Sequence, residues 1–109
     1  MARALVIGGG PAGLMAAEEL ARAGLQVSVA EQMPTMGRKL LMAGKSGLNM
    51  TKAEPREAFD AAYGARPEAL RAALEAFGPE RVQDWARGLG QAVFTGSTGR
   101  VFPEAMKAS

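Results

Sequence analysis

The sequence contains no cysteine and no histidine. The lack of thiols and imidazoles excludes disulfide scaffolds, thiolate zinc sites, Ser-His-Asp triads and cysteine nucleophiles. No apolar run approaches the eighteen or more residues of a membrane span, which excludes a membrane protein. The apolar run after Met1 is too short for a signal peptide, so we expect a cytoplasmic protein. Because the chain has no thiol and no imidazole, any chemistry is expected to come from a cofactor, and no metal site is predicted.

The chain also lacks a strong charge of either sign. The chain has thirteen Lys and Arg residues and eleven Asp and Glu residues, which gives a formal net charge of +2. An excess this small does not indicate a nucleic-acid partner. With 109 residues, of which 48% are apolar, the chain is expected to form one globular domain at most.

Glycine, in contrast, is abundant, with 14 residues in the chain, and three glycines end the first apolar run. That run, Ala4 to Ile7, predicts a strand buried on both faces of a parallel sheet. Small and apolar residues recur at helical spacing from Pro11 to Ala23. Val27 to Glu31 then alternates and is rich in β-branched residues, as in a strand. Together they predict an α/β fold in which residues 3–31 form a right-handed βαβ unit with parallel strands.

Three further segments follow this unit. Residues 32–52 are interrupted by glycines and are expected to be mainly a loop, which would contact a cofactor. Residues 54–90 are expected to be helical, starting with a short helix from about Pro55 to Tyr63. Residues 92–103 are expected to form two short strands around a Gly-rich turn.

Two amphipathic helices are predicted within the helical segment, and prolines at their starts mark them. Pro67 opens the first and Pro79 opens the second, so the two should form a helical hairpin. An apolar stripe runs along both helices and is expected to be core; the alternative is a surface for a partner or a substrate domain. The stripe consists of Leu70, Leu74, Phe77, Val82 and Trp85.

The glycines at 8–13 match the G-x-G-x-x-G pattern, directly after the first strand and at the start of the helix. Gly8 would permit the tight turn, Gly10 would let a pyrophosphate approach the backbone, and Gly13 would let helix and strand pack closely. Backbone N–H groups and the helix dipole would then face the phosphates. This pattern predicts an adenine dinucleotide without choosing FAD over NAD; the alternative is an ordinary tight turn.

Glu31 ends the second strand, eighteen residues beyond Gly13. An acid at this place can accept hydrogen bonds from both hydroxyls of an adenosine ribose, and it repels a 2′-phosphate. The alternative is a solvated strand end.

Two cations, Arg38 and Lys39, follow Gly37 soon after the second strand. Positive charge there would favour a bound pyrophosphate, and the alternative is a solvated basic loop. Further along, Ser46 and Asn49 lie in a glycine-rich stretch whose short polar side chains suit a flavin or its ribityl chain. A plain surface loop is the alternative for this stretch.

Four parts of the sequence resemble the N-terminal part of the YhiN/BaiN-like flavoproteins, which are NAD(P)/FAD-dependent oxidoreductases. They are GGGPAG from Gly8, then Glu31, then GRKLLMAGKSGLNMT from Gly37, then GSTGRVFPEAMKAS from Gly96. The resemblance covers nearly the whole chain, and its last two blocks are distinctive for this group.

The resemblance implies the N-terminal part of a Rossmann-like, two-dinucleotide-binding FAD fold, with FAD as cofactor and NAD(P)H as a candidate electron donor. It places the glycine motif at the pyrophosphate, Glu31 at the adenosine ribose, and the loop from Ser46 toward the flavin. No catalytic residue is assigned. The candidate cofactor-binding residues are Gly8, Gly10, Pro11, Ala12, Gly13, Glu31, Gln32, Gly37, Arg38, Lys39, Ser46 and Asn49.

The loop before Asn49 departs from the common family pattern. Many relatives carry Arg-Cys there, whereas this chain has Gly47-Leu48, so no role of that Arg or Cys carries over. Flavoproteins of this kind run to several hundred residues. We therefore expect residues 1–109 to be a fragment, inactive alone, that is completed by further chain or by self-association.

Two other functions are left open by the residues. One is a non-catalytic module that binds ADP-like ligands or serves interactions. The other is the NAD-binding domain of a dehydrogenase. The run from Gly37 to Thr51 argues against the second, because NAD domains usually proceed quickly from the second strand to another helix and strand.

Overall fold

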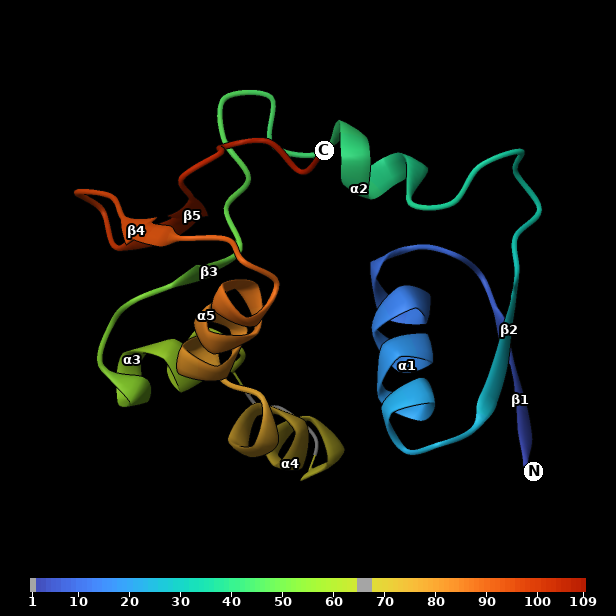
Figure 1. Ribbon diagram of the computed structural model, residues 1–109. Helices are drawn as coiled ribbons and strands as arrows, with labels where there is room; N and C mark the ends of the chain where they lie inside the picture. The colour runs from blue at the N-terminus through green and yellow to red at the C-terminus, as the bar shows by residue number, and fades with distance from the viewer. Residues whose placement is uncertain (1, 65–67) are drawn as a thin grey trace. The chain divides into compact units, whose positions relative to one another are not determined.

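The computed structural model describes residues 2–64 and 68–109 (Figure 1). The chain divides into two units. The first runs up to Ala43 and includes Ala108 and Ser109, and the second comprises Gly44–Lys107. Each unit is described by itself below.

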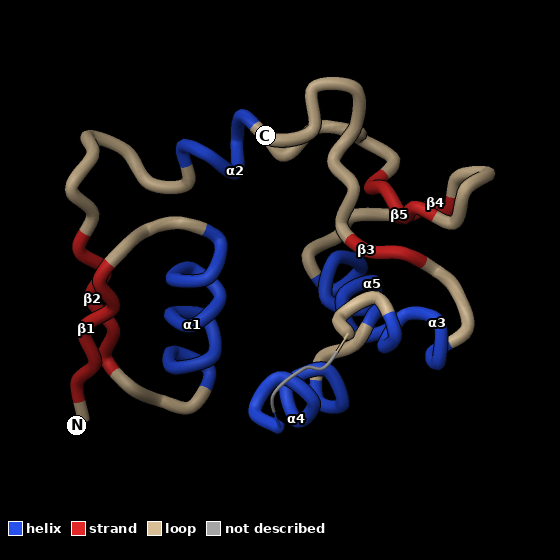
Figure 2. The backbone as a smooth tube through the Cα atoms, turned by 180° about the vertical axis from the view of Figure 1, so that it is seen from behind, coloured by secondary structure: helices blue, strands red, loops and turns tan. Residues whose placement is uncertain are grey.

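The first unit is a strand–helix–strand arrangement. Strand β1 (Arg3–Ile7) leads into helix α1 (Pro11–Arg22), which is followed by strand β2 (Gln26–Ala30). The two strands pair in parallel, with Arg3 opposite Gln26 and Ile7 opposite Ala30. Helix α1 lies along the strand pair in both views (Figures 1 and 2). The predicted α/β class and its parallel βαβ unit are confirmed.

The prediction that β1 is buried on both faces is wrong for the described residues. Ala4 and Val6 are half-buried, whereas Leu5 and Ile7 are 64% and 84% exposed. The reason is geometric: successive side chains of a strand point to opposite faces, and α1 covers one face of this two-stranded sheet.

Residues 32–52 are less loop-like than the sequence suggested. They contain helix α2 (Arg38–Met42) and strand β3 (Thr51–Lys52). Gly37 precedes α2 with φ +69°, a left-handed conformation that glycine adopts without the steric cost of a side chain. Its carbonyl accepts the first helical hydrogen bond from the Leu41 N–H, at 2.9 Å.

The second unit contains a three-stranded antiparallel sheet. Its order is β3, β5 (Arg100–Pro103), β4 (Val93–Thr95), so the last strand of the chain is the central one. Thr51 lies opposite Val101, and Phe94 lies opposite Phe102. Val101 is completely buried. The two strands expected within residues 92–103 are therefore present, and their partner β3 was not anticipated.

Three helices accompany this sheet. They are α3 (Arg56–Ala61), α4 (Glu68–Ala76) and α5 (Pro79–Gly88). Helix α5 packs against β3 and β4 (Figure 1), and Ala86 of α5 is 3% exposed. The start predicted at Pro67 lies outside the described residues.

The apolar stripe of α4 and α5 is not a closed core. Four of its members are half-buried, and Phe77 is 39% exposed, so the prediction of core placement is wrong for Phe77. The half-buried members are Leu70, Leu74, Val82 and Trp85. Among the helices described, none is long and apolar enough to cross a membrane.

Candidate functional site

The turn between β1 and α1 is built from glycine backbone. Gly8 has φ +106°, and its N–H donates to the carbonyl of Ala30 at 2.7 Å, which extends the parallel pairing one residue beyond β1. Gly10 is the N-cap of α1, with extended backbone, and its carbonyl accepts from the Leu14 N–H at 2.9 Å. The chain thus turns sharply from the sheet into the helix at the carboxyl end of β1.

Gly13 has a packing reason to lack a side chain. A Cβ there would collide with the carbonyl oxygen of Gly8 and stand 3.3 Å from Cγ1 of Val6. The first turn of α1 therefore lies directly against the end of β1. This is the close helix–strand contact expected of the third glycine in the motif.

Gly10 has no such reason. No heavy atom of the described residues lies within 4 Å of the position that its Cβ would occupy. The adjoining start of α1 has Pro11 at its first position, no acidic residue in its first turn and no capping side chain within the described chain. Backbone N–H groups at a helix start need partners, and they and the helix dipole attract anions. The space beside Gly10 is therefore suited to an anionic group.

Glu31 holds the turn from the end of β2. Its Oε1 accepts from the Gly9 N–H at 2.9 Å, and its Oε2 accepts from the Met33 N–H at 2.8 Å. The hydrogen bond from Met33 and then that from Gly9 lower the pKa of this carboxyl, with further help from the charge of Arg38. Partial burial opposes this shift. Glu31 is therefore a charged acceptor at neutral pH.

Gly9 was not among the residues predicted for the site, yet it is the buried centre of the turn. Its N–H donates to Glu31, and its carbonyl accepts from the Gly37 N–H at 2.7 Å. The side chain of Met36 covers it, with Cγ 3.0 Å from the position a Cβ would take. The only sequence signal for Gly9 is that it makes three glycines consecutive where the motif requires two.

The residues around this turn are mostly accessible. Pro11, Ala12 and Gln32 are exposed, and so are the two cations Arg38 and Lys39 at the start of α2. The first unit thus brings together most of the predicted site on short connections at one end of the sheet. These residues are Gly8, Gly10, Pro11, Ala12, Gly13, Glu31, Gln32, Gly37, Arg38 and Lys39.

Ser46 and Asn49 belong to the second unit, where both are exposed. Ser46 lies in a turn closed by the Gly47 N–H, which donates to the Gly44 carbonyl at 3.0 Å. Gly47 lies against Phe102 and Met106.

The parts of the two distinctive sequence blocks that belong to the second unit are hydrogen-bonded to each other. The Leu48 N–H donates to the carbonyl of Met106 at 2.7 Å, and the Met50 N–H donates to that of Val101 at 2.9 Å. The Ala53 N–H continues the pairing to the Gly99 carbonyl at 2.7 Å. Ser46 and Asn49 therefore lie in a segment whose backbone is fixed by the end of the chain.

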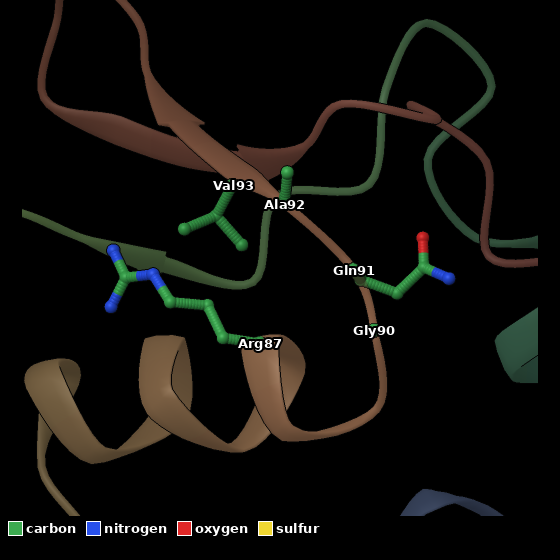
Figure 3. Close-up of a pocket in the computed structure, with 5 residues that line it drawn as sticks. All are labelled: Arg87, Gly90, Gln91, Ala92 and Val93. Atoms are coloured by element: carbon green, nitrogen blue, oxygen red, sulfur yellow. The ribbon is translucent and has the colours of Figure 1, made fainter.

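A separate shallow depression of about 340 Å³ lies where α5 meets the start of β4 (Figure 3). It is wide open to solvent, and among the described residues that line it Arg87 alone carries a charged side chain. Arg87 is paired with Asp84 at 3.1 Å. The depression includes none of the predicted site residues; it is lined by Arg87, Gly90, Gln91, Ala92 and Val93.

Within residues 2–64 and 68–109, no group of three or more acidic side chains could hold a metal ion. Among the described residues, the glycine turn with Glu31 is the arrangement that best suits a ligand, and the helix start there favours an anionic one.

A parallel βαβ unit with this turn defines a Rossmann-type nucleotide-binding domain. Comparison with protein families gives the same class, since the family model described as "HI0933-like protein Rossmann domain" matches residues 2–109. The chain belongs to this HI0933-like family, a YhiN/BaiN-like family of FAD-dependent oxidoreductases. The resemblance noted in the sequence is thereby confirmed. No curated protein matches the chain.

Proposed function

We propose that this chain binds FAD, holding its adenosine diphosphate half as the nucleotide-binding part of a flavin-dependent oxidoreductase. The observation that carries the proposal is the contrast between Gly13 and Gly10. Gly13 is required by the packing of the protein, whereas a Cβ at Gly10 would meet no described atom within 4 Å. A glycine without a packing role, beside an uncapped helix start, is accounted for by a ligand that approaches the backbone there.

The pyrophosphate would lie against the glycine turn. Gly8 and Gly13 fix the shape of the turn, and Gly10, Pro11 and Ala12 would face the ligand. Helix α1 has twelve residues, so its dipole is that of a full-length helix, directed at the phosphates. The chain's contribution here is to orient the phosphates by backbone donors.

Glu31 and Gln32 would serve the adenosine ribose. A carboxylate has room for about four hydrogen bonds, and two of those of Glu31 come from the backbone amides of Gly9 and Met33. Acceptor sites therefore remain for ribose hydroxyls. Its negative charge would disfavour a 2′-phosphate.

Gly37 places Arg38 and Lys39 at the start of α2, and both side chains are exposed. We propose that they partly neutralise the pyrophosphate dianion as a diffuse positive field. Ser46 and Asn49 are proposed to serve the flavin half through short polar side chains. Bound FAD would supply hydride and electron chemistry, with NADH or NADPH as the reductant to be tested.

Gly10→Ala tests the proposal directly. The backbone at Gly10 has φ −88°, so alanine fits it, and within the described part of the chain no non-adjacent residue comes within 4 Å of the new methyl group. We expect unchanged folding and a loss of about tenfold or more in FAD affinity, measured by titration of flavin fluorescence. Gly88→Ala in α5 is the matched control, because it also adds a methyl group in open space, and it should leave the affinity unchanged.

The same titration with ADP and NADH separates the alternatives. Binding of ADP without FAD would indicate an ADP-binding module, and a preference for NADH over FAD would indicate an NAD-binding domain. Equal FAD affinity of Gly10→Ala and the unaltered chain would contradict the proposed pyrophosphate position.

A further inference from the structure

The Gly9 peptide is held on three sides by the segment that follows β2. Its N–H donates to Glu31 Oε1 at 2.9 Å, its carbonyl accepts from the Gly37 N–H at 2.7 Å, and Met36 covers its α-carbon. Gly9 lies between Gly8, which shapes the turn, and Gly10, which would face the proposed pyrophosphate. Whatever fixes this peptide also fixes the turn on either side of it.

The three glycines do not by themselves restrict the backbone conformation of this turn. Three consecutive glycines have more conformational freedom than any other tripeptide, so ordering them costs more entropy. Packing offsets little of that entropy cost at Gly8 and Gly10, because no described atom lies within 4 Å of the position that a Cβ would take at either residue. The hydrogen bonds of Gly9 therefore act together with those of the Gly8 N–H and the Gly10 carbonyl in ordering the turn between β1 and α1.

Glu31 is itself held in place for this contact. Its second oxygen accepts from the Met33 N–H at 2.8 Å, two residues along the chain, which fixes the direction of the carboxylate. Hydrogen bonds to an ionised acceptor are shorter and stronger than those between neutral groups. The Glu31–Gly9 bond joins residues 22 apart in the sequence, so it ties the glycine turn to β2.

We propose that Glu31 is a positioning residue: through the Gly9 peptide it holds the glycine turn in its ligand-binding form before any ligand arrives. The inference rests on the proposed function for its consequence in binding, but the restraint exists without ligand. Affinity for the pyrophosphate part of a ligand then depends on Glu31 even where the ligand has no ribose hydroxyl. A turn ordered in advance loses less entropy on binding.

A ligand without ribose hydroxyls separates this role from direct ribose contact. ADP offers the 2′- and 3′-hydroxyls to Glu31, and 2′,3′-dideoxy-ADP offers neither. If Glu31 only contacts the ribose, its removal weakens ADP and leaves dideoxy-ADP unchanged. If Glu31 positions the turn, its removal weakens both ligands, dideoxy-ADP by about tenfold.

The variants are Glu31→Ala, which removes both hydrogen bonds, and Glu31→Gln, which keeps one acceptor and no charge. Glu19→Gln on α1 is the control: it removes one negative charge from an exposed side chain of the same unit. Calorimetry on the full 109-residue chain gives the two affinities for each variant. Should Glu31→Ala fail to fold, the Gln variant still reports, because it is close to Glu in size and shape.

A second measurement needs no ligand. Amide hydrogen exchange followed by NMR reports the Gly9 N–H directly, with the β2 amide of Val29 as the reference for folding of the unit. In Glu31→Ala we expect the Gly9 amide to exchange at least about tenfold faster while Val29 is unchanged. Glu19→Gln should alter neither amide.

The outcomes are distinct from those of the proposed function. Failure of the unaltered chain to bind FAD or ADP would contradict the function, and the exchange of Gly9 would then decide the positioning role alone. Unchanged exchange of the Gly9 amide in Glu31→Ala would overturn the positioning role of Glu31. Dideoxy-ADP affinity within twofold of the unaltered chain would also overturn it, whereas a loss for both ligands together with faster Gly9 exchange supports it.

Discussion

The carbonyl oxygen of Gly8 occupies the space in which a side chain of Gly13 would have to stand. This contact joins the end of β1 to the first turn of α1, and both of its partners are backbone. Neither can move aside without breaking the hydrogen bond from the Gly8 N–H to Ala30 or the helix itself. The close approach of helix and strand is therefore fixed by the absence of one methyl group.

Gly13→Ala is expected to destabilise the first unit severely, by about 3 kcal/mol or more, because the overlap is with rigid backbone. Urea unfolding followed by circular dichroism measures the change. Gly10→Ala serves as the comparison within the same motif and should fall within about 0.5 kcal/mol of the unaltered chain. Similar losses for the two variants would contradict the assigned packing.

Val101→Ala is expected to cost about 2 kcal/mol, because Val101 lies at the centre of the three-stranded sheet and is completely buried. The neighbouring Arg100→Ala changes an exposed side chain of the same strand and should stay within about 0.5 kcal/mol. Denaturant unfolding of both variants gives the comparison. A loss for Arg100→Ala as large as that for Val101→Ala would show that strand position matters more than burial.

Ile7→Thr tests the exposure of the outer sheet face. Ile7 is 84% exposed, so a β-branched polar residue should change stability by less than about 0.5 kcal/mol. Val6→Ala, one residue earlier, removes methyl groups that face α1 and should cost about 1 kcal/mol. Thermal melting of both variants measures the two losses of stability. A larger loss for Ile7→Thr than for Val6→Ala would show that the face carrying Ile7 is covered in solution.

Local patterns in the sequence were enough to predict the βαβ unit. The run Ala4 to Ile7 and the helical spacing after Pro11 concern neighbours, and the glycine motif lies where the two meet. The pairing of Thr51 with Val101 was not predictable in the same way, because β3 has two residues and its partner lies fifty positions further on. Periodicity carries no signal at that length.

In the candidate site, too, features set by local patterns in the sequence were predictable and contacts between distant residues were not. The acid at 31 was predicted from its spacing to Gly13 and its place after a strand. Its bond to the Gly9 N–H was not, because the motif leaves that position open to any residue. Likewise α2 was taken for loop, since five residues starting after a left-handed Gly37 show no helical period.

Arg38 and Lys39 should contribute to FAD affinity through charge. We expect Arg38→Gln with Lys39→Gln to weaken FAD binding several-fold at low salt, by about 1 kcal/mol, and to flatten its dependence on ionic strength. Fluorescence titration between low and high salt measures both effects. Arg71→Gln, an exposed cation of α4, is the control and should leave the affinity unchanged. If Arg71→Gln weakened FAD binding as much, for each charge removed, as the double variant at Arg38 and Lys39, the attraction would come from net charge alone.

The stability of the first unit should depend on pH through Glu31. Hydrogen bonds from the Met33 and Gly9 amides lower its pKa in the folded chain below the usual value of 4.5, and Arg38 adds to the shift. A group with a lowered folded pKa binds more protons when unfolded, so its contribution is complete above pH 4.5 and is lost as pH falls through the folded pKa. We expect the stability of the unaltered chain to fall below this value more steeply than that of Glu31→Gln. Urea unfolding from pH 7 to pH 3 measures both slopes, and parallel slopes would place the acid-sensitive group elsewhere.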